Sequence, residues 1–292
     1  MTYVVNLSRL HWKVCAEFGR GRAALTARIG TAGVTLPDID LTLQRNHPGH
    51  MMLVSVYRSL RSGEPGVGFD TPGIYAAGEV ADFHWSHGAA IRFLPPSGTR
   101  NWLSLRLFAE RDAEIATDAR RDRIGVAVAW RPWRGGPEPG SFGVGGRVGV
   151  RASAGDNPHV RAVVEGALRI PLSRRLFLGM QAGTARVWGD PARHDLWRIG
   201  VDGRWLRGHA ESLRGSNVHM ARIDLQRPIR FLRLSMFGDW ASVGGDDFHA
   251  VGAGLVFMDG IVRLDVARGL GSNSTDGADP VLRLHFHGDA WF

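Results

Sequence analysis

The sequence predicts an all-β fold, a transmembrane antiparallel β-barrel of about sixteen strands in which residues 1–292 form one domain. Apolar and polar residues alternate over most of the chain, and no long stretch has the i, i+3, i+4, i+7 apolar spacing of an amphipathic helix. No run of about 18 apolar residues occurs, which excludes a transmembrane helix. Ten tryptophans are many for a soluble domain of this size, and aromatic residues lie near the ends of the alternating segments.

Turn signals separate the alternating segments and define the predicted strands. Each strand with its turn takes about 18 residues, which suits transmembrane strands joined by short turns on one side. The longest piece without strand character, 61–81, is predicted to be an extracellular loop, and a second loop is predicted near 205–216. The predicted strands lie at about 4–17, 22–32, 34–45, 50–60, 82–95, 101–112, 122–134, 141–154, 158–172, 174–188, 196–206, 217–229, 231–243, 248–258, 260–270 and 280–292.

The alternation has the same sense from strand to strand. In the segment 101–112, Leu103 and Leu105 share one face while Arg106 and Glu110 share the other, because successive side chains of a strand point to opposite faces. A soluble β-sandwich shows the same period. Here, however, the polar face carries glycines and charges of both signs, and the other face is aliphatic with aromatics at its ends. This pattern favours a charged lumen and a lipid-facing exterior with aromatic girdles.

The composition limits the partners and cofactors. Cys15 is the only cysteine, so no internal disulfide and no cysteine metal cluster can form. The formal charge of +8 raises the question of nucleic acid, but the arginines are scattered singly and form no basic block. A basic lumen, or a rim that faces lipopolysaccharide, explains them better than a nucleic-acid groove does. We therefore expect the lipid bilayer and lipopolysaccharide as partners, no nucleic acid and no cofactor.

The sequence around Met1 is strand-like at once and lacks the pattern of a signal peptide. A protein bound for the bacterial outer membrane needs such a peptide. The sequence is therefore expected to be a mature form, a domain of a longer protein or a chain with a misassigned start, with the signal peptide and any upstream domain absent, and we favour the second or the third of these.

Five short motifs follow one another in the C-terminal part of the chain. They are Trp205-Leu206-Arg207-Gly208-His209, Ala221-Arg222-Ile223-Asp224-Leu225-Gln226-Arg227-Pro228-Ile229, Leu234-Ser235-Met236-Phe237-Gly238-Asp239-Trp240-Ala241, Ala250-Val251-Gly252-Ala253-Gly254-Leu255 and Arg263-Leu264-Asp265-Val266-Ala267. In this order and spacing they resemble the barrel of the outer-membrane assembly-factor superfamily, which includes the BamA and TamA insertases and the two-partner secretion translocators. The N-terminal half matches that family only loosely, near Asn6-Leu7-Ser8-Arg9-Leu10.

The resemblance implies that the loop near 205–216 is directed into the lumen and that its motif, Leu206-Arg207-Gly208, pairs through Arg207 with Asp239. Strand parity agrees, because the apolar neighbours of Asp239 face lipid and Asp239 then faces inward. Removal of one partner from such a shielded pair is expected to cost on the order of several kcal/mol. The plainer alternative is a solvated loop cation at Arg207. Four further residues are expected to be lumen charges: Arg222, Asp224, Arg263 and Asp265.

The last strand ends on a terminal aromatic, Phe292, after alternating apolar positions. The resemblance implies that this strand is the signal read by the outer-membrane insertion machinery, with Leu284, Phe286, Gly288 and Phe292 as its residues. An amphipathic last strand without a targeting role is the alternative.

No catalytic or metal site is predicted. His285, His287 and Asp289 share one strand face and can approach a zinc ion, but imidazoles on a wet lumen wall are commoner. His84 and His87 fall on opposite faces of a strand or in a loop. No G-x-S-x-G element occurs, and no serine has evident histidine and acid partners, so we do not expect an enzyme.

The leading hypothesis from the sequence is therefore a barrel related to protein insertion or translocation factors, in the bacterial outer membrane, that assists the assembly or export of unfolded polypeptides. The alternative is a membrane anchor or passive pore for an upstream domain, possibly enzymatic, without insertase activity. A soluble β protein is the third reading, and it predicts that the purified chain needs no detergent.

Overall fold

The computed structural model describes residues 9–18, 21–31, 37–47, 49–62, 83–95, 102–114, 117, 119–135, 141–200, 206–209, 213–229, 232–257, 262–271 and 281–286. Nearly all of them lie in antiparallel strands, and the helical turn among them is the short 3-10 segment η2 (Arg193–Asp195). The predicted all-β class is therefore confirmed. Within the described residues, no helix is long and apolar enough to cross a membrane.

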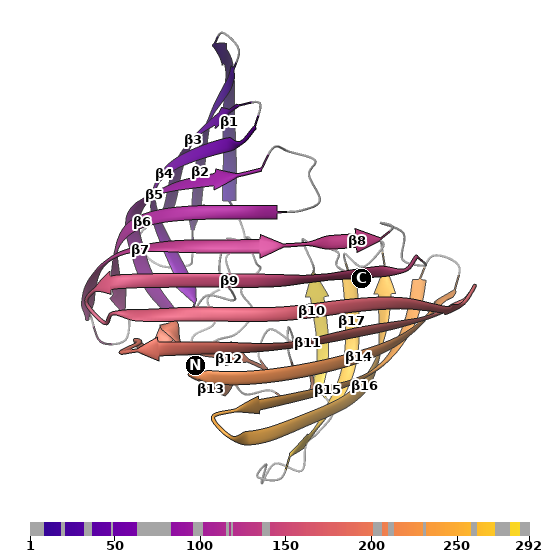
Figure 1. The fold of residues 1–292 in the computed structure, drawn as a ribbon. Coiled ribbons are helices and arrows are strands. Elements are labelled where there is room, and N and C mark those ends of the chain that lie inside the picture. The colour runs from indigo at the N-terminus through magenta and orange to yellow at the C-terminus, as the bar shows by residue number, and fades with distance from the viewer. Residues whose placement is uncertain are drawn as a thin grey trace. The chain divides into compact units, whose positions relative to one another are not determined.

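Figure 1 shows the strands in chain order, coloured from indigo to yellow. Their bounds are β1 (Arg9–Phe18), β2 (Gly21–Thr31), β3 (Pro37–Asn46), β4 (Met51–Ser62), β5 (Phe83–Leu94), β6 (Trp102–Glu114), β7 (Arg120–Arg131), β8 (Trp133–Gly135), β9 (Gly143–Gly155), β10 (His159–Ser173), β11 (Leu176–Gly189), β12 (Trp197–Ile199), β13 (Leu213–Gly215), β14 (Asn217–Ile229), β15 (Leu232–Val243), β16 (Asp246–Phe257), β17 (Val262–Gly271) and β18 (Val281–Phe286).

Hydrogen bonds join strands that are neighbours in sequence. The order of the main sheet is β1-β2-β3-β4-β5-β6-β7-β9-β10-β11-β14-β15-β16-β17-β18, with β8 beside β9. Local turn chemistry explains the hairpins. Between β15 and β16, Gly244 and Gly245 both have positive φ, at 64° and 106°, as a two-residue turn that follows the strand twist requires. The main sheet is therefore a meander, except that β12 and β13 lie between β11 and β14 in the chain and form a separate two-stranded sheet.

Two predicted strands differ from the observed ones. The segment 196–206 was expected to be a strand of the barrel, but only Trp197–Ile199 is a strand in its described part, and this strand pairs with β13 in a separate two-stranded sheet. The segment 122–134 is interrupted at Pro132, and its two parts, β7 and β8, both pair with β9. Proline has no N–H for a sheet ladder, which accounts for the break.

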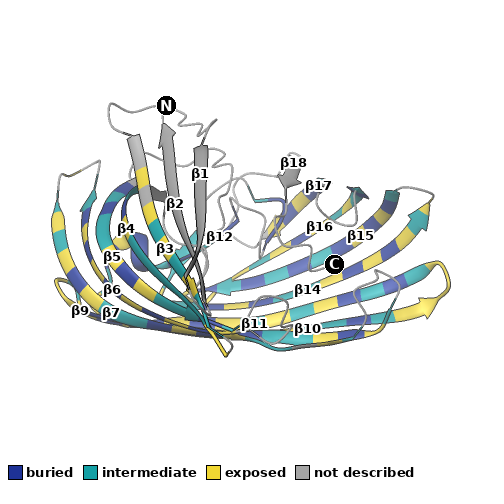
Figure 2. Ribbon diagram, turned by 90° about the horizontal axis from the view of Figure 1, so that it is seen from above, coloured by how far each residue is buried: buried dark blue, intermediate teal, exposed yellow. Residues whose placement is uncertain are grey.

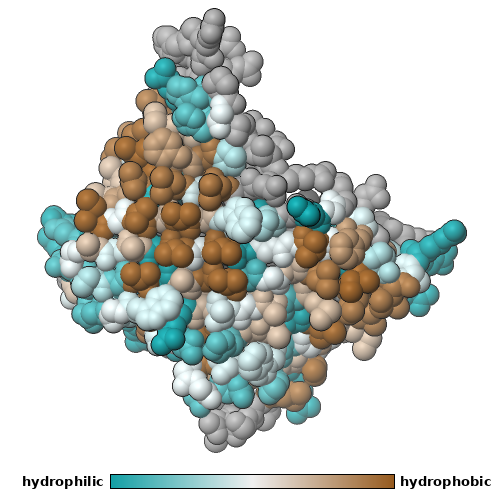
Figure 3. Space-filling model, in the orientation of Figure 1, coloured by the Kyte–Doolittle hydropathy of each residue, from teal (hydrophilic) through white to brown (hydrophobic). Residues whose placement is uncertain are grey.

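The two faces of the strands differ in the way that the alternation predicts. Along β6, Leu103, Leu105 and Leu107 are exposed by 59%, 36% and 45%, whereas Arg106 and Glu110 are only 6% and 5% exposed. Figure 2 shows the resulting bands of buried and exposed residues along the strands, and Figure 3 shows apolar side chains gathered over β5 to β7. A soluble sandwich buries its leucines. Here the aliphatic side chains lie outside and charged groups are buried, which is typical of a barrel in lipid.

The chain divides into two compact units. Unit 1 contains Met1–Arg131, Val148–Ala162 and Val187–Leu196. Unit 2 contains Pro132–Arg147, Val163–Arg186 and Trp197–Phe292. Each unit contains a buried cluster of charged side chains.

Candidate functional site

The short segment Leu206–His209 lies against the inner face of unit 2. Leu206 and Arg207 are 0% and 1% exposed. Gly208 has a φ of 82°, a left-handed conformation that residues with a Cβ rarely adopt. A solvated loop would leave these side chains in water, so the alternative of a free loop cation at Arg207 is wrong.

Arg207 is held by Asp239 of β15 through three hydrogen bonds. The Nε atom donates to Oδ2 at 2.7 Å and Nη2 donates to Oδ1 at 2.6 Å, so the guanidinium is bidentate. The backbone N–H of Arg207 donates to the same Oδ2 at 3.0 Å. Because the carboxylate binds both the side chain and the backbone of Arg207, it fixes the path of the loop as well as the charge.

Two further carboxylates complete the surroundings of Arg207. Its Nη1 and Nη2 donate to Asp224 of β14 at 3.2 and 3.3 Å, and Nη1 lies 3.6 Å from Oδ2 of Asp265 of β17. Burial by itself lowers the pKa of the Arg207 guanidinium, but the hydrogen bonds to Asp239 and the charge of Asp224 outweigh burial and raise that pKa. The loop arginine is therefore a permanent cation.

Two arginines from the strand wall balance the remaining negative charge. Arg222 donates to Asp239 at 3.2 Å. Arg263 donates to Asp265 at 2.8 and 2.9 Å and to Asp224 at 2.7 Å. The cluster thus contains as many arginines as aspartates, and each carboxylate has at least one guanidinium partner. We call these six residues the loop-arginine cluster: Arg207, Arg222, Asp224, Asp239, Arg263 and Asp265.

Small residues on β16 make room for the cluster. A Cβ at Gly254 would collide with the carboxylate of Asp265, and a Cβ at Gly252 would lie 2.5 Å from the ring of Phe237. That ring supports Arg207, whose Cζ lies 3.3 Å from the ring centroid, so the guanidinium makes a cation–π contact. The two glycines therefore allow side chains of β15 and β17 to reach across β16.

A second contact holds the other side of the loop. A Cβ at Gly208 would lie 2.8 Å from backbone atoms of Arg268 and Gly269 in β17, so only glycine allows this approach. The next residue, His209, places Nε2 2.9 Å from the backbone oxygen of His249 and packs edge-on against Phe248. The segment Leu206–His209 thus contacts β15, β16 and β17.

The structure brings together eight residues that the sequence singled out: Leu206, Arg207, Gly208, Arg222, Asp224, Asp239, Arg263 and Asp265. It adds Phe237, Gly252 and Gly254, which the motifs contain but to which the sequence assigned no contact. Of the proposed targeting strand, the backbone register places Leu284 opposite Leu264 and Phe286 opposite Val262. Gly288 and Phe292 lie outside the described residues, as do His287 and Asp289.

Unit 1 contains a second buried cluster that the sequence did not indicate. Arg123 of β7 donates to Asp195 at 2.7 and 2.9 Å and contacts Asp112, and Arg151 of β9 contacts Glu110. Burial by itself raises the pKa of the Asp195 carboxyl, but the charge of Arg123 holds that pKa well below its usual range. Asp195 belongs to η2, so this network binds the turn to the strand wall.

No family model matches the chain, and no curated protein matches its sequence. Solved structures match its fold. BamA from Haemophilus ducreyi lacking POTRA domains 1–3 aligns with a TM-score of 0.65 at 12% identity, over 90% of this chain and 63% of that one. CdiB from Acinetobacter baumannii aligns with a TM-score of 0.54 at 14% identity, over 90% and 52%. The chain thus spans only 63% and 52% of these proteins, and its fold is that of their barrels.

Proposed function

We propose that this chain is the membrane-spanning barrel of an outer-membrane protein related to insertion and translocation factors, and that it assists the assembly or export of other polypeptides. Its fold, shared with BamA and CdiB, supports the outer-membrane location and a polypeptide as the substrate. The proposed action is to hold and guide an unfolded chain at the membrane, without a covalent step and without a cofactor.

The exposed aliphatic face supports insertion in lipid. Val56, Ile124 and Met236 are 59%, 63% and 67% exposed. A fully exposed side chain of this kind gains about 1.5–3 kcal/mol when it leaves water for an apolar environment, and these side chains gain the part of it that corresponds to their exposed area. The favoured surroundings of this face are therefore acyl chains, with lipopolysaccharide and phospholipid as the surrounding molecules.

The observation that supports the functional proposal is that the loop-arginine cluster binds Arg207, and with it the loop, to the inner face of the sheet. A passive pore needs only a closed wall. In this chain, one loop is fixed on the inner face of the sheet by three aspartates, two glycines of β16 and the left-handed Gly208. A loop fixed in this way determines which part of the inner wall a polypeptide can reach. We infer that the loop positions the client polypeptide.

The test uses the full-length gene product in phospholipid vesicles, with a small unfolded outer-membrane protein in urea as the client. Protease protection and heat-modifiable migration of the client report its insertion. We expect wild-type protein to raise the initial insertion rate several-fold over empty vesicles, and Arg207→Ala to remove most of this gain. Arg227→Ala is the matched control, because Arg227 is an exposed arginine of β14.

Two results would argue against the proposal. If wild-type vesicles insert the client no faster than vesicles that contain an unrelated barrel, the insertion activity is absent. If the protein conducts ions and retains an upstream domain at the membrane while client handling is absent, the membrane anchor or passive pore is the correct function instead.

A further inference from the structure

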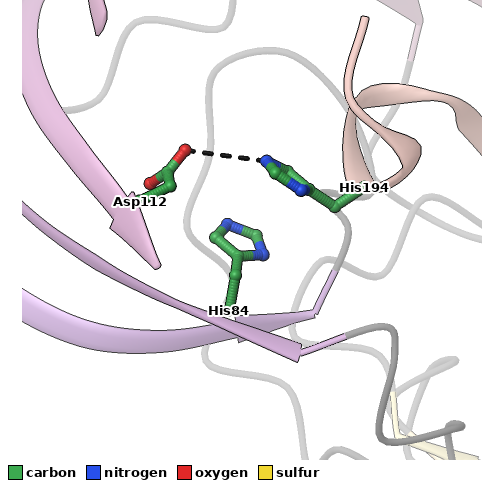
Figure 4. Close-up of side chains that lie close together, drawn as sticks. All are labelled: His84, Asp112 and His194. Carbon is green, nitrogen blue, oxygen red and sulfur yellow. Dashed lines mark ion pairs between the residues drawn. The ribbon is translucent and has the colours of Figure 1, made fainter. Parts of the chain in front are cut away.

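Three side chains from distant parts of the sequence meet in unit 1, whereas the loop-arginine cluster belongs to unit 2. They are His84 of β5, Asp112 of β6 and His194 of η2, and they are 3%, 0% and 5% exposed. One ligand atom of each lies within 4.8 Å of the ligand atoms of the other two. Figure 4 shows that the three side chains point toward one another.

The distances suit a shared ion better than a direct hydrogen bond. Nε2 of His194 lies 3.6 Å from Oδ2 of Asp112, beyond the 2.7–3.2 Å of a hydrogen bond. Two ligands bound tetrahedrally at about 2.0–2.1 Å to one ion lie about 3.3 Å apart. Within the described residues, neither ring nitrogen of His194 nor Oδ1 of Asp112 makes a hydrogen bond. Buried polar atoms in this state are costly, and an ion bound by the imidazole and the carboxylate would remove part of this cost.

The surrounding residues match the outer layer of a metal site. Oε1 of Glu114 lies 3.5 Å from Nδ1 of His194, and its negative charge favours the tautomer with the proton on Nδ1, which presents the lone pair of Nε2 to the ion. The rings of His84 and His194 are stacked, with centroids 4.1 Å apart. Arg123 contacts Oδ2 of Asp112, the oxygen that lies 3.6 Å from Nε2 of His194, so this oxygen would be shared between the guanidinium and the ion.

We propose that His84, Asp112 and His194 bind one divalent transition-metal ion of the zinc class. Two imidazoles and one carboxylate are donors that favour Zn²⁺ over Mg²⁺ or Ca²⁺, which prefer all-oxygen sites. With three protein ligands, the fourth position belongs to water. Since two ligands come from adjacent strands and the third from η2, the ion fixes this turn to the wall of unit 1 and acts as a structural cross-link.

The test measures metal binding by the full-length protein in detergent. The protein carries no histidine tag and has Cys15 replaced by serine, so that neither a tag nor the thiol binds metal. After EDTA treatment, Zn²⁺ is titrated by calorimetry, and Co²⁺ serves as a spectroscopic probe. We expect one equivalent of Zn²⁺, no competition from millimolar Mg²⁺ or Ca²⁺, and Co²⁺ absorption bands typical of nitrogen and oxygen ligands.

The variants are His194→Asn and Asp112→Asn, and the matched control is His219→Asn, because His219 is an exposed histidine. We expect the first two to weaken Zn²⁺ binding at least tenfold and to abolish the Zn²⁺-dependent rise in Tm, while the control behaves as wild type. X-ray absorption of Zn²⁺ bound to wild-type protein reports the ligands without any variant. Absence of stoichiometric binding, equal losses in the control, or a ligand set without imidazole would overturn the proposal.

Discussion

The pairing of Arg207 with Asp239 leads to a quantitative prediction about stability. The substitution Arg207→Ala removes two side-chain hydrogen bonds to Asp239 and two to Asp224, keeps the backbone bond to Asp239, and leaves three aspartates with two arginines. The substitution Asp239→Asn leaves three arginines with two aspartates. Each single variant therefore contains an uncompensated charge in a buried place. We expect each to lower the free energy of unfolding by about 3–5 kcal/mol.

The double variant Arg207→Ala/Asp239→Asn restores the balance, with two arginines and two aspartates in the cluster. We therefore expect its loss of stability to fall short of the sum of the single losses by about 2 kcal/mol or more, because residues in one charged network couple. The assay is equilibrium unfolding by guanidinium in phospholipid vesicles, followed by tryptophan fluorescence. Arg227→Ala controls for removal of an arginine as such.

A different outcome would refute this reasoning. Single losses below about 0.5 kcal/mol, or single losses that add within about 0.5 kcal/mol in the double variant, would mean that the buried pair contributes no specific interaction. Arg207 would then lie on the inner wall without stabilising the fold.

Three further predictions concern neighbouring features. Gly254→Ala forces a methyl group against the carboxylate of Asp265, and we expect a loss of about 1–3 kcal/mol in unfolding free energy, whereas Gly166→Ala, which meets open space, should change stability little. Gly208→Ala places a Cβ in a left-handed conformation and against β17, so limited proteolysis should cleave the segment near 206–209 faster than in wild type. An unchanged cleavage rate would contradict the packing of this segment against β17. Met236→Arg should cost about 2–4 kcal/mol in vesicles if this face meets the bilayer midplane, whereas a change within about 0.5 kcal/mol would indicate a water-exposed surface.

Strand parity made the inner wall predictable from sequence. Because side chains alternate strictly, one assignment of the leucines of β6 to the exterior fixed Arg106 and Glu110 on the opposite face, and the same logic placed Asp239 inward. The turn at Gly244 and Gly245 was predictable for a similar local reason. Features that depend only on residues close together in the chain could thus be predicted from the sequence.

Features that depend on contacts between distant segments were not predictable. Trp197 and Ile199 alternate like residues of a sheet strand, yet their partners are Gly215 and Leu213 in a small separate sheet. No local pattern distinguishes these two pairings. His194 likewise lies in a turn without periodicity, so nothing in its surroundings indicated that it meets Asp112.

The register of strand β14 against strand β15 could not be predicted from the sequence either, although it determines which residues of the loop-arginine cluster pair. It places Arg222 opposite Asp239 and Asp224 opposite Phe237. The motifs supplied the residue types, and parity supplied the face. Which acid meets which base follows from the stagger between strands, which only the structure gives.

The two glycines of β16 also protect the alignment of this sheet against slippage. A shift of one residue would turn every side chain of β16 to the wrong face. A shift of two residues would bring either Ala250 beside Phe237 or Val256 beside Asp265, and each carries a methyl group where no space exists. Only one register of β16 therefore leaves room for both Phe237 and Asp265. The two positions without a side chain thus specify the register of this sheet.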